Sequence, residues 1–239
     1  MDAIRTARAR ARAELIREIK ESARGQLAVH GATGLSLRAV ARELGMASSA
    51  VYRYFPSRDD LLTALLVDGF DALGGCAERA AAGAPGGAPA DRWVAVWTAV
   101  RGWAVEHPQE YALLYGSPVP DYAAPPDTVA PAARVGLVLT ELVREAELRG
   151  TLRPVERSGG TAGGVAGGSA RGGVTETAAA GLPGWAAARL VECWAQLFGL
   201  ISFELFGHFN QVVEDPAAFF AQTVRETGTW LSEAGSARR

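Results

Sequence analysis

The chain has 239 residues, of which 49% are hydrophobic and 21% are charged, which is the composition of a soluble globular protein. No apolar run approaches the roughly 18–20 residues of a membrane-spanning helix, and the charged N-terminal segment does not resemble a secretory signal. The two cysteines, Cys76 and Cys193, have no His or Cys neighbours at metal-ligand spacing. We therefore expect a cytoplasmic protein without a membrane segment, disulfide scaffold, metal or cofactor.

The formal net charge of −2 argues against a protein that binds nucleic acid indiscriminately. The charge is unevenly distributed, however, because residues 1–58 contain eleven Lys or Arg and five Asp or Glu, a formal charge of +6. The remainder of the chain consequently carries −8. A basic N-terminal segment before an acidic body favours an end that contacts phosphates, although a run of charge is by itself often only a solvated surface.

Apolar residues recur every four positions from Ala3 to Leu27, which predicts a long first helix with one buried stripe. Glycines at positions 31 and 34 should end this helix.

Two short helices are predicted next. Ser36 is placed as the N-cap of a helix over 36–44, whose apolar residues follow helical spacing. Gly45 should stop this helix. A third helix is expected over about 48–54, with Pro56 ending it.

A fourth helix should begin at Ser57, which can form a capping box with Asp60. Small residues over 81–90 are typical of a linker. The helices expected beyond it cover about 90–106, 108–116, 127–149, 184–209 and 216–233.

Residues 158–184 are mostly Gly, Ala, Ser and Thr and have few large apolar side chains to pack, so we expect a flexible Gly-rich loop there. Its glycines are not a phosphate-binding loop, since no strand precedes them and no Gly-Lys-Ser/Thr follows. The sequence thus predicts an all-α protein with two domains, over 1–57 and 58–239.

Residues 36–55, SLRAVARELGMASSAVYRYF, have the arrangement of a helix-turn-helix, with a turn of three to four residues that contains Gly45. Small side chains at the start of its second helix allow backbone N–H groups to approach phosphates and base edges. Tyr and Arg side chains further along are long enough to reach the DNA backbone. The residues predicted to face outward are Ser48, Ser49, Ala50, Tyr52 and Arg53.

The stretch 45–61, GMASSAVYRYFPSRDDL, resembles the recognition helix and the start of the fourth helix of the TetR family of bacterial regulators. Arg58 and Asp59 stand where Lys-Glu or Lys-Asp is commoner in that family, which keeps the charges. The resemblance is specific over about residues 10–65 and architectural beyond them. It implies an N-terminal three-helix DNA-binding domain followed by a helical domain for ligand binding and dimerisation, with a double-stranded operator and a second copy of the chain as partners.

Within this resemblance, base reading is assigned to Ser48, Ser49 and Ala50, with Tyr52 sharing it. Phosphate contacts are assigned to Ser36, Arg38, Tyr52, Arg53, Tyr54 and Arg58. Some alternatives stay open: Ser36 could act first as a helix cap, and Tyr52 could cover the apolar stem of a neighbour. An arm with Arg8, Arg10 and Arg12 either reaches a minor groove or adjacent backbone or is a solvated tail.

Aromatic and polar residues of the body are candidates for a pocket that holds a small-molecule inducer. These residues are Trp93, Trp97, Trp103, His107, Tyr111, Tyr115, Trp194, Phe198 and Glu204. The alternative is that the aromatic stripes are plain core. His107, Glu204 and His208 stand in apolar surroundings, so we expect them to be paired within the core or in contact with the ligand.

Residues 190–209 are apolar nearly all round, which predicts a helix covered by the core on one side and by a partner subunit on the other. With the helix that contains Phe219, Phe220, Val224 and Trp230, it would form a four-helix interface across a two-fold axis. The segments 103–115 and 194–209 also resemble a WHG-type C-terminal domain found in some regulators of this family.

The leading hypothesis is a repressor that binds a palindromic operator as a homodimer and is released by a small apolar or aromatic ligand of unknown identity. The alternative is a ligand-independent DNA-binding architectural protein or activator. An enzyme is not expected, because no nucleophile, base and orienting group stand at recognisable spacing.

Overall fold

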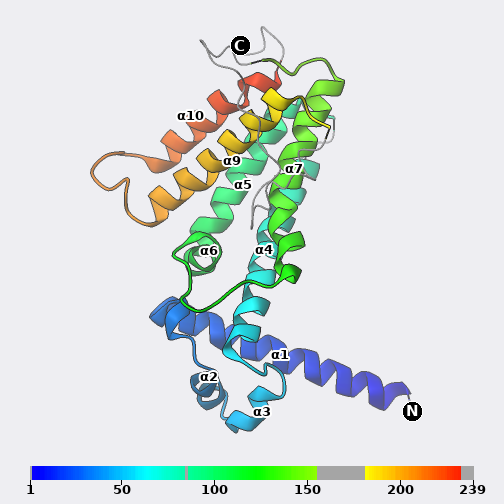
Figure 1. The fold of residues 1–239 in the computed structure, drawn as a ribbon, viewed down its shortest axis with the longest axis vertical. Coiled ribbons are helices and arrows are strands. Elements are labelled where there is room, and N and C mark those ends of the chain that lie inside the picture. Colours follow the sequence, from blue (N-terminus) through cyan, green and yellow to red (C-terminus); the bar gives the residue numbers. More distant parts are fainter. Residues whose placement is uncertain (1, 84–85, 155–180, 233–239) are drawn as a thin grey trace. The chain divides into compact units, whose positions relative to one another are not determined.

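The structure, a computed structural model, describes residues 2–83, 86–154 and 181–232. The described residues form helices joined by turns, with no strand among them, as the all-α prediction requires (Figure 1). They divide into two compact units. The first consists of Met1–Gly69 with His107–Thr128, and the second of Phe70–Glu106 with Val129–Arg239. The chain passes between the units within one helix, α4, and again at residues 106–107 and 128–129.

The first unit has one hydrophobic core built on the predicted stripe of the first helix, in which Ile19, Ala23 and Leu27 are buried. Residues of the next three helices complete this core, among them Val40 and Val51. The elements of the unit are α1 (Asp2–His30), η1 (Ala32–Gly34), α2 (Leu37–Glu43), α3 (Ser48–Tyr52), the first part of α4 (Arg58–Ala82), α6 (Pro108–Tyr115) and η2 (Pro126–Thr128).

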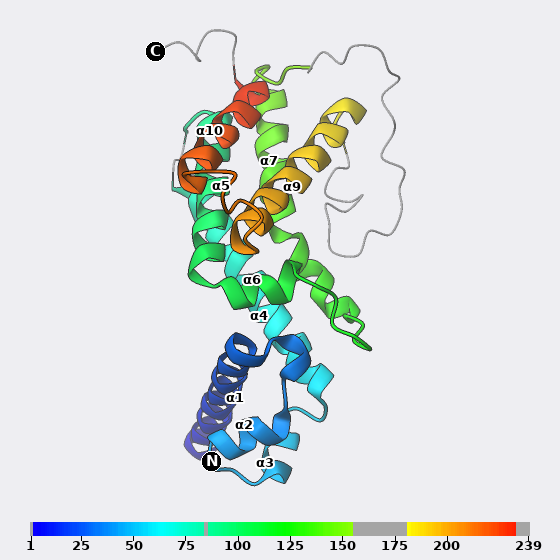
Figure 2. The same cartoon turned by 90° about the vertical axis from the view of Figure 1, so that its left-hand side faces the viewer.

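The second unit is a bundle in which α5 packs against α7, α9 and α10 (Figure 2). Trp93 and Trp97 of α5 are fully buried in its core, where Phe220 of α10 packs against Trp97. The elements of the unit are the second part of α4, α5 (Pro89–Glu106), α7 (Val129–Leu148), α9 (Gly184–Leu205), α10 (Pro216–Gly228) and η3 (Thr229–Leu231).

Some helix ends differ from the prediction. The third helix ends at Tyr52, and the helix expected to reach residue 209 ends at Leu205, because Gly207 adopts a φ of 81° that a helix cannot continue. Residues 155–180 lie outside the described residues, and most of the predicted 158–184 loop falls there. Residues 181–183 lead into α9, so Gly184 is helical rather than part of the loop.

One helix meets a membrane-span criterion of length and composition that no segment was expected to meet. Among the described residues α9 is long and apolar enough, by length and composition, to cross a membrane. Core helices pass the same test, and Leu190, Cys193, Leu197 and Ile201 of α9 are buried inside the second unit. We therefore interpret its composition as that of a core helix.

Candidate nucleic-acid interface

The turn between α2 and α3 fixes the geometry of the helix-turn-helix. Gly45 has a φ of 64°, and its N–H donates to the carbonyl of Arg42 at 3.2 Å. The N–H of Met46 donates to the carbonyl of Ala41 at 2.8 Å. These two bonds form a Schellman motif, which requires a residue that tolerates a left-handed backbone. The glycine therefore sets the direction in which the chain leaves α2 and enters α3.

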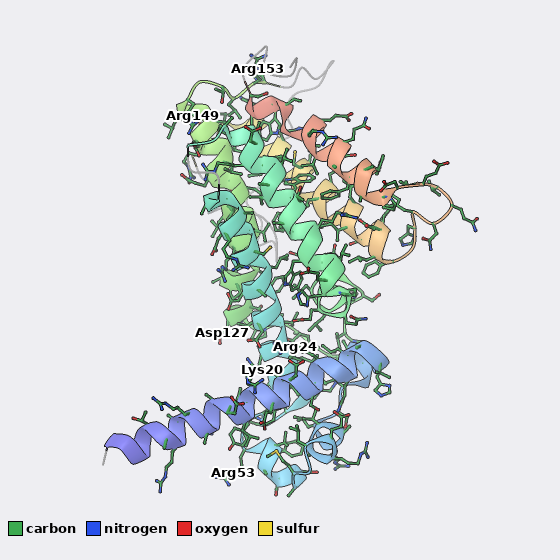
Figure 3. The ribbon with its side chains drawn as sticks, turned by 180° about the vertical axis from the view of Figure 1, so that it is seen from behind. Lys20, Arg24, Arg53, Asp127, Arg149 and Arg153 are labelled. Carbon is green, nitrogen blue, oxygen red and sulfur yellow. The ribbon has the colours of Figure 1, made fainter. Side chains whose placement is uncertain are left out.

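α3, the predicted recognition helix, has one buried side and one exposed side. Val51 is fully buried in the core of the first unit, whereas Tyr52 is 41% exposed. Ala50 is half-buried. Arg53 lies at the end of α3 (Figure 3). The structure thus brings together, as the exposed surface of α3 and its C-cap, Ser48, Ser49, Tyr52 and Arg53.

Two of the predicted phosphate-binding arginines are available for an external anion. Arg38 on α2 and Arg53 are exposed, and neither forms an ion pair in the part of the chain that the structure describes. Arg58 is half-buried instead, and its Nη2 donates to the carbonyl of Ala32 at 2.8 Å. A phosphate contact by Arg58 would therefore use its remaining N–H groups.

Ser36 acts as the N-cap of α2, since its Oγ accepts the N–H of Ala39 at 3.4 Å. The start of α4 is capped reciprocally, because the N–H of Asp60 donates to Ser57 Oγ at 3.0 Å and the N–H of Ser57 donates to Asp60 Oδ2 at 2.9 Å. Both capping predictions are confirmed. These caps hold the ends of the helices that carry the interface.

A buried glutamine that the sequence analysis missed joins α1 to α2. Gln26 is 4% exposed, and its Oε1 accepts the N–H of Ser36 at 3.1 Å while its Nε2 donates to Glu43 at 3.2 Å. Ser22 also donates to the carboxylate of Glu43. A polar residue next to Leu27, at the edge of the apolar stripe, was the available signal. Gln26 positions α2 from both of its ends.

An ionic cluster, which the sequence analysis also missed, ties α1 to α4 and α6 inside the first unit. Its basic members, Lys20 and Arg24 of α1, are labelled in Figure 3. Asp68 of α4 accepts hydrogen bonds from Lys20 at 2.8 Å and from Arg24 at 3.0 Å. Arg24 also lies 3.4 Å from the carboxylate of Glu110 on α6, which His107 approaches to 3.4 Å. The spacing of charges along α1 alone does not reveal this cluster, because its acidic members are more than 40 residues away in sequence.

Three of the nine candidate ligand residues belong to the first unit, namely His107, Tyr111 and Tyr115. Tyr111 is fully buried and packs against Tyr115, with ring centroids 5.2 Å apart. Burial raises the pKa of the Tyr115 phenol above its ordinary value, so the group is neutral at physiological pH. His107 is exposed at the junction of α5 and α6 rather than buried, contrary to expectation.

A cavity of about 260 Å³ lies within the first unit, bounded by the end of α1, η1 and α6. Its walls include Leu27, Ala32, Leu113 and Val119. Pockets for drug-sized molecules usually start at about 300 Å³. We assign it no ligand.

The other six candidates belong to the second unit, where aromatic rings form a continuous cluster. The Trp93 ring lies 5.3 Å from that of Trp97 and 6.1 Å from that of Trp230, measured between centroids. The indole Nε1 atoms of these three residues are buried and have no hydrogen-bond acceptor among the residues that the structure describes. Of the other aromatic candidates, Trp103 and Phe198 are buried and Trp194 is half-buried. The sixth candidate, Glu204, is the one charged residue of the six.

Glu204 is satisfied within the second unit, because Arg101 Nε donates to its Oε2 at 2.8 Å and Arg101 Nη2 binds the other oxygen. This bidentate ion pair with Arg101 explains how the Glu204 carboxylate is accommodated on a largely apolar helix. His208, which was expected in the same apolar setting, is exposed in the turn after α9, where it packs on the Phe203 ring with centroids 5.0 Å apart. Among the residues described, no three or more His, Cys, Asp or Glu are grouped as a metal site.

Comparison with known proteins agrees with this geometry. Residues 19–65 match the family described as bacterial regulatory proteins, tetR family, and residues 93–227 match the tetracyclin repressor-like C-terminal domain. The chain is 41% identical over 218 residues to the HTH-type transcriptional regulator Mb1846 of Mycobacterium bovis, covering 89% of this chain and 91% of that protein. The same values hold for Rv1816 of Mycobacterium tuberculosis.

A solved structure, that of the regulatory protein SCO4313, superposes on this chain with a TM-score of 0.71 at 30% sequence identity. The superposition covers 92% of this chain and 97% of SCO4313. The matches extend over both units.

Proposed function

The chain belongs to the TetR family of DNA-binding transcriptional regulators, and from this premise we propose that it is a cytoplasmic repressor released from its operator by a small ligand. In this proposal the protein binds a palindromic operator as a homodimer, and the ligand is apolar or aromatic. The observation that carries the DNA-binding part is the exposed surface of α3, held by the Gly45 turn and the buried Gln26.

The proposed interface divides base reading from phosphate binding. Ser48 and Ser49, with Ala50 beside them, read base edges in the major groove, and Tyr52 shares this role. Phosphates are bound by residues that surround α3, namely Ser36, Arg38, Arg53, Tyr54 and Arg58. The exposure of Arg38 and Arg53 supports this division, because each guanidinium is free to bind an external anion.

Exposed apolar side chains on α9, α10 and their connection support dimerisation through these helices. Phe203 is 51% exposed, Phe206 44%, Val212 76% and Phe219 42%. Large aromatic residues exposed together usually mark an interaction surface. Of the four residues expected on the last helix, Phe220, Val224 and Trp230 are buried in the core of the second unit, so Phe219 is the one available to a partner.

The proposed ligand site is the aromatic cluster of the second unit. Trp93 and Trp97 are fully buried, so a ligand would enter only as the bundle opens. The proposed response uses α4, whose residues up to Gly69 belong to the first unit and the rest to the second. A pivot of α4 would change the separation of two recognition helices, which must match half-sites about 34–36 Å apart.

The experiment that tests DNA binding is a titration of the purified protein against its upstream DNA at several salt concentrations. We expect tight, salt-dependent binding of a palindrome, weakened by the Tyr52→Ala substitution by about 1–3 kcal/mol, the usual cost of removing a side chain that binds a base or a phosphate. Tyr122→Phe is the matched control, because Tyr122 is half-buried and bonded to Thr63. Weak binding that is equal for every DNA and unchanged in Tyr52→Ala would overturn the assignment of α3.

The purified protein and its upstream DNA also serve to test the proposed dimerisation and the proposed release by a ligand. Phe203→Asp should shift the protein to monomers in sedimentation velocity and weaken operator binding, whereas Leu148→Asp, at an 83% exposed position on α7, should not. A screen of small aromatic compounds against the operator complex should then find at least one that releases the DNA. If none does, the ligand-independent alternative is favoured.

A further inference from the structure

The N-terminal turns of α1 extend beyond the core that the rest of the helix helps to build (Figure 1). Leu15 and Ile16 are half-buried and Ile19 is the first fully buried residue of α1. From residue 6 to residue 14, every side chain is exposed. At 1.5 Å per residue this segment is about 13 Å long, so it adds a helical projection to the unit that carries α3.

Two arginines of this projection share the face of α1 that packs on the core. With 3.6 residues per turn, Arg8 and Arg12 align with Ile19 and Ala23, whereas Arg10 lies on the opposite side. The side of α1 that is apolar where the core covers it thus carries arginines where the helix leaves the core. Arg8 and Arg12 therefore lie on the side of α1 that faces the core of the first unit, to which α2 contributes.

The contact between Arg12 and Tyr54 agrees with this direction. The Arg12 guanidinium carbon lies 4.9 Å from the centroid of the Tyr54 ring, in a cation–π arrangement just after α3. Tyr54 is half-buried and directly follows the exposed Arg53. The basic face of the projection is therefore continuous with the exposed surface of the recognition helix.

The arginines of this face have no acidic partner among the described side chains. Across the part of the chain that the structure describes, Arg8, Arg10 and Arg12 form no ion pair, and the nearby Glu14 is bonded to Arg17. A guanidinium that stacks on an aromatic ring keeps its N–H groups free at the edge, where they match the paired oxygens of a phosphate.

We propose that the N-terminal turns of α1 form a second DNA contact, in which Arg8 and Arg12 bind phosphates of the duplex that flanks the half-site read by α3. Tyr54 holds the Arg12 guanidinium in position for this contact. The inference rests on the proposed operator binding and adds to it a surface outside the helix-turn-helix. The operator footprint is consequently longer than the sequence that α3 reads.

The test compares two duplexes of the upstream DNA, one trimmed to the two half-sites and one extended on each side by about half a helical turn, roughly 5 bp. Arg8→Ala is measured beside Arg10→Ala, which removes the same charge from the opposite face of the same helix. Both residues are exposed, so neither substitution disturbs the core. Arg8→Lys retains the charge.

On the extended duplex, Arg8→Ala should weaken binding several-fold and lower the slope of log affinity against log salt by about 0.9 for each phosphate that is no longer bound. Arg10→Ala should bind as the wild type does, and Arg8→Lys should keep most of the slope. On the trimmed duplex, all the variants should bind alike. Arg12→Ala should resemble Arg8→Ala, and hydroxyl-radical footprinting should show the flanking protection shortened in both.

Equal effects of Arg8→Ala and Arg10→Ala, or a loss of affinity that is the same on the trimmed and extended duplexes, would overturn this inference. The proposed function would survive that result provided that the wild type binds the palindrome and Tyr52→Ala binds it more weakly. If the wild type binds neither duplex above the level of unrelated DNA, the proposed function fails and this inference fails with it.

Discussion

Arg134 of α7 crosses α4 directly over Gly74, so closely that a Cβ atom at position 74 would lie 2.6 Å from the Arg134 Cβ. The guanidinium then binds Asp71 on one side of the glycine, with Nη1 2.6 Å from Oδ1, and Glu78 on the other, with Nε 2.8 Å from Oε1. The absence of a side chain on α4 thus permits the close approach of α7, and two carboxylates keep it there.

The first prediction concerns this approach. Alanine is the better helix former by about 1 kcal/mol, but Gly74→Ala should still destabilise the protein. The new methyl group would clash with Arg134 Cβ, which is bonded directly to the backbone of α7 and can move only if α7 moves. Gly102→Ala on α5 is the control, since a Cβ there meets nothing within 4 Å. Urea unfolding should show a lower midpoint for Gly74→Ala and a higher one for Gly102→Ala. Equal increases in both midpoints would show that α7 does not depend on the glycine.

The second prediction concerns pH. The hydrogen bond from Arg134 lowers the pKa of Glu78 below that of an unfolded chain. The pair therefore stabilises the fold above the ordinary glutamate pKa of about 4.3, and this contribution is lost as the pH falls through the lowered pKa.

Glu78→Gln should consequently lower the free energy of unfolding at pH 7, by less than about 1 kcal/mol because Glu78 is 46% exposed. The difference from the wild type should vanish in acid. Glu147→Gln, at an exposed residue of the same unit, should change stability at neither pH. A deficit in Glu78→Gln that persists at a pH well below the lowered pKa would contradict the assigned cause.

Local signals predicted the first unit well. The stripe of α1, the Ser36 cap, the Gly45 turn and the reciprocal cap of Ser57 and Asp60 all depend on residues within a few positions of one another. Backbone geometry and hydrogen bonding over such short distances are determined by the neighbouring residue types, so the pattern is sufficient.

Contacts between residues far apart in sequence were not predictable in this way. The packing of α6 against α1, and the ionic cluster of Arg24 with Asp68 and Glu110, follow from the tertiary fold and leave no spacing in the sequence. His107 and His208 were expected in apolar surroundings because their neighbours are apolar. Both lie at helix ends, where the chain turns toward solvent.

The third prediction concerns the buried glutamine. Gln26→Met keeps the shape of the side chain but leaves the N–H of Ser36 without its acceptor, which should cost about 1–3 kcal/mol of stability. Gln222→Met removes an exposed amide on α10 that binds Glu226, and it should change stability by less than about 0.5 kcal/mol. Denaturant titrations measure both. If both substitutions lower the stability by similarly small amounts, a water molecule takes the place of the Gln26 amide as acceptor of the Ser36 N–H.

The fourth prediction concerns thiol reactivity. Burial raises the pKa of the Cys193 thiol to about 11 and raises that of the half-buried Cys76 to a lesser degree. The thiolate is the reactive form, so an aromatic disulfide reagent at mildly alkaline pH should label both thiols slowly in the native protein. In urea, where both thiols are exposed, it should label them rapidly. In the Cys76→Ser variant, the remaining native reaction should be slower still. Rapid labelling of Cys193 in that variant would contradict its burial.

The last prediction concerns Arg24 of α1, which contacts two of the three segments in which the chain passes between the units. Asp68 belongs to α4 and Glu110 to α6, and Arg24 of α1 contacts both. A double-mutant cycle with Arg24→Met and Asp68→Asn should give a coupling energy of about 1 kcal/mol, because both side chains are largely shielded, at 26% and 31% exposed. The exposed pair of Arg17 and Glu14 on the same helix should give a smaller coupling energy, and that energy should weaken more in high salt because solvent and ions screen exposed charges. If the two cycles give equal coupling energies, the charges do not tie α1 to α4. A change in α4 would then reach the helix-turn-helix through apolar packing alone.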